Sequence, residues 1–393
     1  MTSGRDRIDA PVGAAQRPTT PYFRSLRDRI AALGGLFNAH LHIDRSGTFE
    51  ATLELLQQEA AAASHLSLAR KHSLIPLVHE SACYEPSALR ERVGHYLEMM
   101  IDVGTTRADT VVDVTDDRVG QSALESLLQL KHALRDRIDF RIGAYSPLGF
   151  RDDEPKRWAL IEEASRRADF LGSLPERDDR AAYPEHIGFD ESCRRIIALS
   201  AERDLPVHLH VDQQNLAVED GTERVIRIAR ELGLPVDRSE EPRIWLMHVI
   251  SPSVYPDGRF RRLLEGLAEF HIGVICCPSA AISMRQVRQF SSPTCNSIAR
   301  VLEMLAAGVH VRVGSDNICD ITSPAGTVDL VDELFVLCNA VRYYDLEVLA
   351  KLGAGRRLDE ADRQRVAAHL VRDAEESAAV FARHGAALAG HPR

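Results

Sequence analysis

The sequence predicts an α/β fold, a TIM-type (β/α)8 barrel of eight parallel strands alternating with helices. The chain has 393 residues, and barrels of this kind run from about 200 to more than 400. Apolar, strand-like runs alternate with amphipathic stretches from about residue 33 onward, the pattern of consecutive βαβ units. Hydrophobic residues make up 45% of the chain and charged residues 27%, a balance that suits a buried core under a solvated surface.

Nine segments have the length and apolar character of strands, one more than the barrel needs, so at least one of them has another structure. In chain order they are residues 35–42, 74–79, 108–114, 139–144, 168–171, 206–211, 243–248, 271–277 and 309–314. The helices predicted between them are residues 87–101, 120–134, 190–202, 223–232 and 297–307. Three further helices are expected at 327–344, 346–352 and 360–384.

This order of elements suggests three parts. Residues 1–32 are polar and rich in proline and glycine at their start, so we expect an N-terminal arm. Residues 33–345 form the predicted barrel, and residues 346–393 form C-terminal helices packed on it. Almost no strand-like sequence lies before residue 33 or after residue 316, so we expect no accessory β-sandwich domain.

The net charge and the cysteine content limit the possible binding partners and the cellular compartment of the protein. The formal net charge of −10 argues against nucleic acid and anionic membranes, which attract clustered cations, and favours a small-molecule substrate. No apolar run approaches the roughly 20 residues of a membrane span. The seven cysteines form no CxxC pair, which indicates a reducing cytoplasm. We also expect a homo-oligomer.

The first predicted strand ends in two histidines, His40 and His42. Side chains two residues apart in a strand lie on the same face. At the carboxyl end of a barrel strand that face looks into the mouth of the barrel, where such enzymes carry their chemistry. Two neighbouring imidazoles are good ligands for zinc, although an HxH sequence also arises by chance in a chain with 16 histidines.

Three later strands also end in chemically competent residues. The strand at 206–211 carries His208 and His210 on one face, the strand at 243–248 ends in His248, and Asp316 follows the strand at 309–314. Taken singly, a lone histidine is usually a core residue and an aspartate at a strand end is usually a turn former. Together with the first strand, the ordered series predicts a single metal site.

At this point the sequence resembles the amidohydrolase superfamily, and within it the cytosine deaminase-like branch. The resemblance covers about residues 33–340 and rests on HLHID at 40–44, GTTRADTVVDVTDD at 104–117, HVDQ at 210–213, WLMHVI at 245–250, CCPSAAISM at 276–284 and GSDNICD at 314–320. It implies that His40, His42, His210 and Asp316 hold one divalent ion: zinc, or alternatively iron or manganese. It assigns His248 to the attacking water or the substrate.

The choice of His210 rather than His208 as the third histidine ligand rests on matching HVDQ to the family pattern HxDE. His208 then lies deeper on the same face. In the implied mechanism the ion lowers the pKa of water toward 7, Asp316 transfers the proton, and His248 stabilises the developing oxyanion.

Two positions depart from the cytosine deaminase pattern. Gln213 stands where those enzymes carry a proton-shuttling glutamate, and an amide cannot take over that proton at physiological pH. Pro147 stands where a glutamine reads the pyrimidine edge. Cytosine is therefore not the expected substrate, and Gln213 becomes a candidate substrate-binding residue together with Arg45, Asp113 and Asn317.

The sequence thus predicts a metal-dependent hydrolase of a non-peptide carbon–nitrogen bond, in a cyclic amide or imide, an amide, or an amine on a nitrogen heterocycle. One alternative is an aminohydrolase of a purine, pyrimidine, triazine or pterin that uses a substitute carboxylate such as Asp212 or Glu80. A second is a barrel that binds a ligand without catalysis. A salt bridge to a neighbouring loop is the structural alternative for Arg45.

Overall fold

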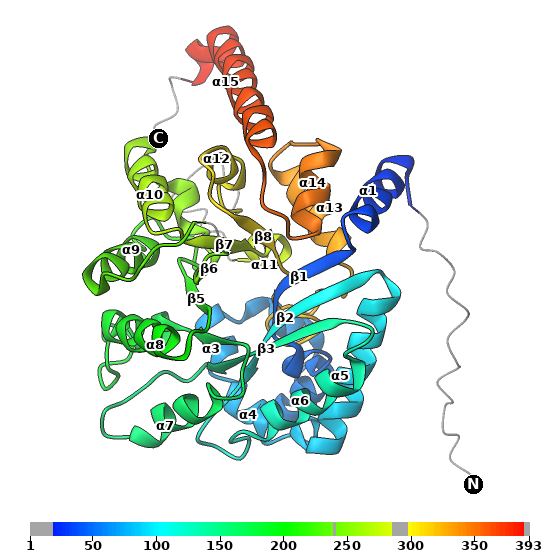
Figure 1. The fold of residues 1–393 in the computed structure, drawn as a ribbon, viewed down its shortest axis with the longest axis vertical. Coiled ribbons are helices and arrows are strands. Elements are labelled where there is room, and N and C mark those ends of the chain that lie inside the picture. Colours follow the sequence, from blue (N-terminus) through cyan, green and yellow to red (C-terminus); the bar gives the residue numbers. More distant parts are fainter. Residues whose placement is uncertain (1–18, 239–240, 285–297, 389–393) are drawn as a thin grey trace.

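The computed structural model describes residues 19–238, 241–284 and 298–388. An inner barrel of strands is surrounded by helices (Figure 1). The strands are β1 (Leu36–Leu41), β2 (Thr105–Asp113), β3 (Asp139–Ser146), β4 (Phe170–Ser173), β5 (Val207–Val211), β6 (Ile244–His248), β7 (Gly273–Cys276) and β8 (Val311–Val313). The predicted eight-stranded barrel is confirmed.

The eight strands are parallel and follow one another in chain order around the barrel. The ring closes one step beyond β8, where Asp316 forms a parallel bridge with Leu41. The amide of Asp316 donates to the carbonyl of His40 at 3.0 Å, and the amide of His42 donates to the carbonyl of Asp316 at 2.9 Å. Barrel closure therefore fixes the end of β1 against the loop that carries Asp316.

The end of the barrel opposite to these residues is plugged. Phe37, Trp245, Met247 and Ile275 form a buried cluster contributed by β1, β6 and β7. The guanidinium of Arg312 lies 4.2 Å from the ring centre of Trp245 and 5.0 Å from that of Phe37. In barrels of this kind the active site lies at the other end, at the carboxyl ends of the strands.

Helices cover the outside of the barrel between successive strands (Figure 1). They are α1 (Pro21–Ala32), α2 (Phe49–Leu56), α3 (Leu68–His72), α4 (Ile75–His79), α5 (Pro86–Asp102), α6 (Ser122–Leu134), α7 (Pro155–Ala164), α8 (Phe189–Arg203), α9 (Gly221–Leu232), α10 (Asp257–Glu269), α11 (Pro278–Ile282), α12 (Val301–Ala306), α13 (Leu330–Ala340), α14 (Leu346–Gly353) and α15 (Glu360–Leu388). Two short 3-10 helices, η1 (Ile43–Arg45) and η4 (Pro175–Asp178), follow β1 and β4.

The strand predicted at 74–79 is wrong, because this segment forms helix α4. A short apolar run does not distinguish a buried strand from one turn of a buried helix. Pro76 lies in the first turn of α4, where its missing amide hydrogen costs no helical hydrogen bond. In a central parallel strand the same proline would interrupt the ladder. Removing this segment leaves the eight strands that the barrel needs.

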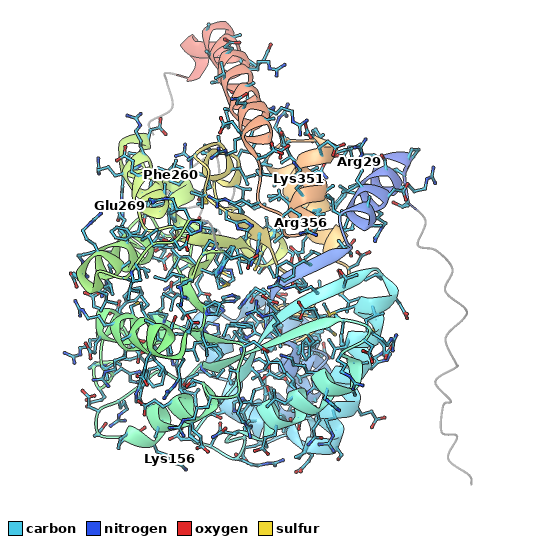
Figure 2. The ribbon with its side chains drawn as sticks, in the orientation of Figure 1. Arg29, Lys156, Phe260, Glu269, Lys351 and Arg356 are labelled. Carbon is cyan, nitrogen blue, oxygen red and sulfur yellow. The ribbon has the colours of Figure 1, made fainter. Side chains whose placement is uncertain are left out.

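Part of the expected N-terminal arm is an ordered helix. Helix α1 packs on α14, and its Leu26 and Ile30 are buried. Arg29 of α1 pairs with Glu347 of α14, and Figure 2 shows Arg29 near Lys351 and Arg356. Helix α14, the first helix after residue 345, contacts β1 and β8 and thus packs on the barrel.

The described ranges contain no helix with the length and apolarity that a bilayer crossing requires. Six cysteines lie within these ranges, and all six are free thiols.

Candidate metal centre

Four side chains of metal-binding type gather at the carboxyl end of the barrel. His40 lies in β1, His42 directly follows it, His210 lies in β5, and Asp316 follows β8. Each offers one ligand atom, and these atoms all lie within 4.8 Å of one another. All four residues are buried, with at most 6% of the surface of any of them exposed.

The separations of the donor atoms fit a single small cation. The Nε2 atoms of His40 and His210 are 3.0 Å apart, and the Oδ1 atom of Asp316 lies 3.4 Å from Nε2 of His42. Ligand atoms at about 2.1 Å from a tetrahedral zinc ion are themselves roughly 3.4 Å apart. The described residues thus bring together the donor set that the sequence predicts, in an arrangement that an ion would complete.

The backbone at Asp316 holds this residue against β1. Besides its two hydrogen bonds to β1, Asp316 adopts a left-handed conformation with φ of 60°. Two residues earlier, a Cβ atom on Gly314 would lie 2.7 Å from the carbonyl oxygen of His40. Only glycine permits this close approach, which brings the Asp316 loop to the histidines.

The structure distinguishes His210 from His208. The Nδ1 atom of His210 donates to the carbonyl of Ser173 at 3.1 Å, which leaves Nε2 as the atom directed at the other donors. The ring of His208 instead packs on Phe170, with ring centres 4.3 Å apart, and lies outside the donor group. Of the two histidines, His210 is therefore the one that the fold brings to the cluster.

Burial sets the protonation of the cluster. It lowers the pKa of His40 and of His210 well below the ordinary value, so both imidazoles are neutral at pH 7, the form that ligates metals. Burial opposes ionisation of Asp316, but the nearby imidazoles of His248 and His42 hold the pKa of its carboxyl well below its usual range. Imidazoles in this form, together with a carboxylate, are suited to a divalent ion.

His248 lies beside the cluster at the end of β6. Its ring centre is 5.6 Å from that of His210, and it lines the same cavity. Its φ of 72° is unusual for a residue with a side chain, as is the φ of 56° at Asp212 after β5. Such strained conformations concentrate at functional sites, where surrounding contacts maintain them.

A cavity of about 20 Å³ is lined by three of the four donor residues, His42, His210 and Asp316. Its walls come from the barrel mouth and from the segment between β1 and β2, and they include His42, Arg45, Leu68, His72, Tyr145, Leu174, His210, Gln213, His248, Asp316 and Asn317. A larger, mainly apolar cavity of about 1030 Å³ shares Leu68, Met284, Thr322 and Ser323 with it. The inner cavity is smaller than a heterocycle, so a substrate must displace part of this wall.

Both predicted amide contacts line the cavity. The Nε2 atom of Gln213 donates to Oε2 of Glu176 at 2.8 Å. The Nδ2 atom of Asn317 donates to Oδ2 of Asp320 at 2.5 Å. Gln213 is 5% exposed and Asn317 is 3% exposed, so both amides are held within the wall rather than in solvent.

Arg45 and Asp113 form one buried unit. The guanidinium of Arg45 lies against both carboxylate oxygens of Asp113, with Nε 2.9 Å from Oδ2. Asp113 also accepts from His79 at 3.0 Å and does not line the cavity, whereas Arg45 does. The structure therefore places Arg45 where a substrate can meet it and Asp113 behind it. The partner of Arg45 is a strand-end aspartate, rather than a loop residue as the salt-bridge alternative supposes.

Three residues near the site carry no motif that points to them. Tyr145 lies with its ring centre 5.3 Å from that of His42, and His72 reaches the cavity from α3. Glu176 follows β4 in η4 and contacts Gln213. Tyr145 lies two residues before the departure at Pro147, which was the one sequence signal near it. His72 lies close to a segment predicted as a strand, so its position over the barrel mouth was not predictable.

Known proteins share this fold and this sequence pattern. No family profile matches the chain. The N-isopropylammelide isopropyl amidohydrolase of Pseudomonas sp. (strain ADP) is 25% identical over 320 residues, 78% of this chain and 69% of that protein. The structure of 5-methylcytosine deaminase from Klebsiella pneumoniae superposes with a TM-score of 0.69 and 23% identity, over 82% of this chain and 74% of that chain. The structure of N-isopropylammelide isopropylaminohydrolase from Burkholderia multivorans superposes with a TM-score of 0.62 and 19% identity, over 85% and 82%.

The chain resembles amidohydrolases in both sequence and fold. The superpositions establish the shared barrel, and the sequence match to the Pseudomonas protein extends over most of it. The buried donor cluster of this chain lies at the strand ends to which the motifs assign it.

Proposed function

We propose that this chain is an amidohydrolase that hydrolyses a non-peptide carbon–nitrogen bond in a small nitrogen heterocycle or cyclic amide, using one bound divalent ion. The single observation that carries the proposal is the convergence of His40, His42, His210 and Asp316 within 4.8 Å, next to a cavity. The names of the similar proteins, which refer to ammelide and cytosine compounds, support a heterocyclic substrate.

Zinc is the ion that we propose for the site. Three imidazoles and a carboxylate form a nitrogen-rich donor set of the kind that zinc accepts, and iron or manganese are the alternatives. When bound, a divalent ion supplies a nucleophilic water at neutral pH and polarises the bond under attack. Cytoplasmic localisation and a homo-oligomeric state stay predictions from the sequence.

The protein groups divide the remaining work. Asp316 accepts a proton from the attacking water and returns it to the departing nitrogen. His248, buried and neutral, donates a hydrogen bond to the oxygen that gains charge in the tetrahedral intermediate. Arg45, held by Asp113, offers a fixed positive charge to a substrate carbonyl.

Deamination with a substitute carboxylate is the second candidate. Asp212 does not fill that role, because its two oxygens accept from the amides of Gly221 and Thr222 at 2.7 and 2.8 Å. Glu80 is exposed and does not line the cavity. Glu176 is the carboxylate in contact with Gln213, so it is the candidate for the substitute carboxylate of a deaminase.

A substrate panel tests the proposal. Zinc-loaded protein is incubated with N-isopropylammelide, cytosine, guanine, hydantoin and glutarimide, while amine release, ammonia release and ring opening are followed separately. We expect zinc-dependent hydrolysis of at least one compound. Release of amine or ammonia would assign an aminohydrolase, and ring opening would assign a cyclic amidase. Turnover that is unaffected by removal of the metal would contradict the proposal.

A further inference from the structure

The side-chain amides of Gln213 and Asn317 line the cavity, and each is hydrogen-bonded to a carboxylate. Gln213 donates through Nε2 to Glu176, and Asn317 donates through Nδ2 to Asp320. Both amides belong to the cavity wall beside the metal cluster. Gln213 and Glu176 join the loops after β5 and β4, whereas Asn317 and Asp320 both lie in the loop after β8.

The carboxylates decide which way each amide faces. An ionised carboxylate only accepts hydrogen bonds, and the structure turns the amino group of each amide toward its carboxylate, Nε2 of Gln213 toward Glu176 and Nδ2 of Asn317 toward Asp320. In a planar amide the carbonyl oxygen then lies on the other side. In the described part of the chain, neither Oε1 of Gln213 nor Oδ1 of Asn317 takes part in a hydrogen bond given by the structure.

The supports behind the amides are themselves fixed. Oδ1 of Asp320 accepts from the backbone amides of Thr322 and Ser323 at 2.8 and 2.9 Å, so this carboxylate cannot swing away from Asn317. The backbone at Gln213 is fixed by its neighbour Asp212, whose carboxylate accepts from Gly221 at 2.7 Å. Because the amide oxygens of Gln213 and Asn317 are held in place before a ligand binds, they favour ligands whose hydrogen-bond donors meet them.

Resting on the proposed function, we propose that the cavity selects heterocycles that present N–H donors, such as cyclic ureides, imides and the keto tautomers of hydroxy-azines. The carbonyl oxygens of Gln213 and Asn317 receive these N–H groups, and Arg45 receives a ring carbonyl. A fully aromatic azine with only ring-nitrogen acceptors would leave both amide oxygens buried without a partner. In this account Glu176 is a positioning residue, because it acts through Gln213.

The binding test compares N-isopropylammelide with its derivative methylated at the ring N–H groups, by calorimetric titration of the zinc-loaded full chain. We expect wild type to bind the N–H form at least about 10-fold more tightly, the effect of leaving buried acceptors unpaired. Glu176→Gln lets Gln213 turn over, and should reduce this ratio to about 3-fold or less. Glu219→Gln is the matched control, since Glu219 bonds to Ser251 and not to the amide of Gln213.

The outcomes separate this inference from the proposed function. Equal binding of the two forms by wild type, or an unchanged ratio in Glu176→Gln, would overturn the inference. A wild-type protein that neither binds nor hydrolyses either triazine counts against a triazine as the substrate of the proposed hydrolysis. If neither triazine binds, NMR still tests the orientation of Gln213. Its side-chain amide resonance is assigned as the one that is missing from the spectrum of Gln213→Glu. It should shift in Glu176→Gln and keep its position in Glu219→Gln, and an unmoved resonance in Glu176→Gln would refute the pairing.

Discussion

Asp316 combines a backbone role and a side-chain role at one position. Its amide and carbonyl close the barrel against β1, while its carboxylate lies 3.4 Å from the imidazole of His42. Because the backbone contacts do not depend on the side chain, its chemistry can be changed without opening the barrel.

Asp316→Asn is therefore expected to remove activity and retain the fold. An amide cannot accept the proton of the attacking water, and loss of such a group typically costs about 10²- to 10⁴-fold in rate. Turnover of the substrate found in the panel and the far-ultraviolet circular dichroism spectrum are the two measurements. A variant with near-wild-type turnover would show that Asp316 is not the proton carrier.

His248 provides a contrasting test, because it lies beside the donor group without belonging to it. His248→Asn should lower kcat by roughly 10²-fold or more, as expected when a hydrogen-bond donor to a developing oxyanion is lost. The zinc content of this variant should stay at one ion per chain. Loss of zinc from His248→Asn would instead make His248 a ligand.

For single residues, the sequence predicted the candidate metal donors well and the hydrogen bonds that support the site poorly. His40, His42, His210 and Asp316 were predictable because a strand end determines where a side chain points. The hydrogen bond from Gln213 to Glu176 joins two loops, and nothing in the sequence aligns those loops in space. For the same reason Asp113 was expected to be a substrate contact but lies behind Arg45.

At the scale of elements, a buried ion network joins three of them beneath the cavity. Arg45 lies in η1, Asp113 in β2 and His79 in α4, and His79 also bonds to Asp117 at 2.6 Å. Burial lowers the pKa of His79, but its hydrogen bonds to Asp113 and Asp117 outweigh this and raise it to about 9. A charged His79 thus ties α4 to Asp113 at the end of β2.

This network makes stability depend on pH. The pKa of His79 is about 9 in the folded chain, against 6.5 for an unperturbed imidazole. The resulting stabilisation is full below pH 6.5 and is lost as the pH rises through 9. Its upper bound is about 3.5 kcal/mol, at roughly 1.4 kcal/mol per pKa unit.

Urea unfolding between pH 6 and 10 measures the effect. His79→Gln should flatten the decline in the free energy of unfolding across this range. His132→Gln, at an exposed position on α6, is the matched control and should leave the decline unchanged. Identical pH profiles for wild type and His79→Gln would contradict the role assigned to His79.

Element prediction succeeded where the connections are short. Each strand from β2 to β7 is followed by a helix that begins within about ten residues of the strand's end, and the alternation in the sequence reflects this. The connection from β1 to β2 holds α2 to α5 and its apolar runs are short, so α4 was mistaken for a strand. Helix α1 was expected to be part of an arm because its partner, α14, lies more than 300 residues later.

At the scale of the whole molecule, the donor cluster joins segments that are distant in the chain. Its ligands come from β1, from β5 and from the loop that closes the barrel after β8. The strand order explains why the fold was predictable from alternation alone, because each strand pairs with the next one in sequence. An ion bound here would link the first, middle and last parts of the barrel.

Zinc should therefore stabilise the folded chain. A ligand that binds only the folded state adds about 2.7 kcal/mol when its free concentration is 100 times Kd. We expect the melting temperature to rise with buffered zinc and to fall on treatment with a chelator. A melting temperature that does not respond to either treatment would indicate that no ion bridges these strands.

The most direct test of the metal centre is the zinc content of purified protein after equilibration with buffered zinc. Elemental analysis of wild type, His210→Asn and His208→Asn compares two histidines of the same strand, of which one lies in the donor group. We predict about one ion per chain in wild type and His208→Asn, and a loss of most of it in His210→Asn. Absence of zinc, iron and manganese from wild type, or equal zinc content in all three proteins, would contradict the metal centre described above.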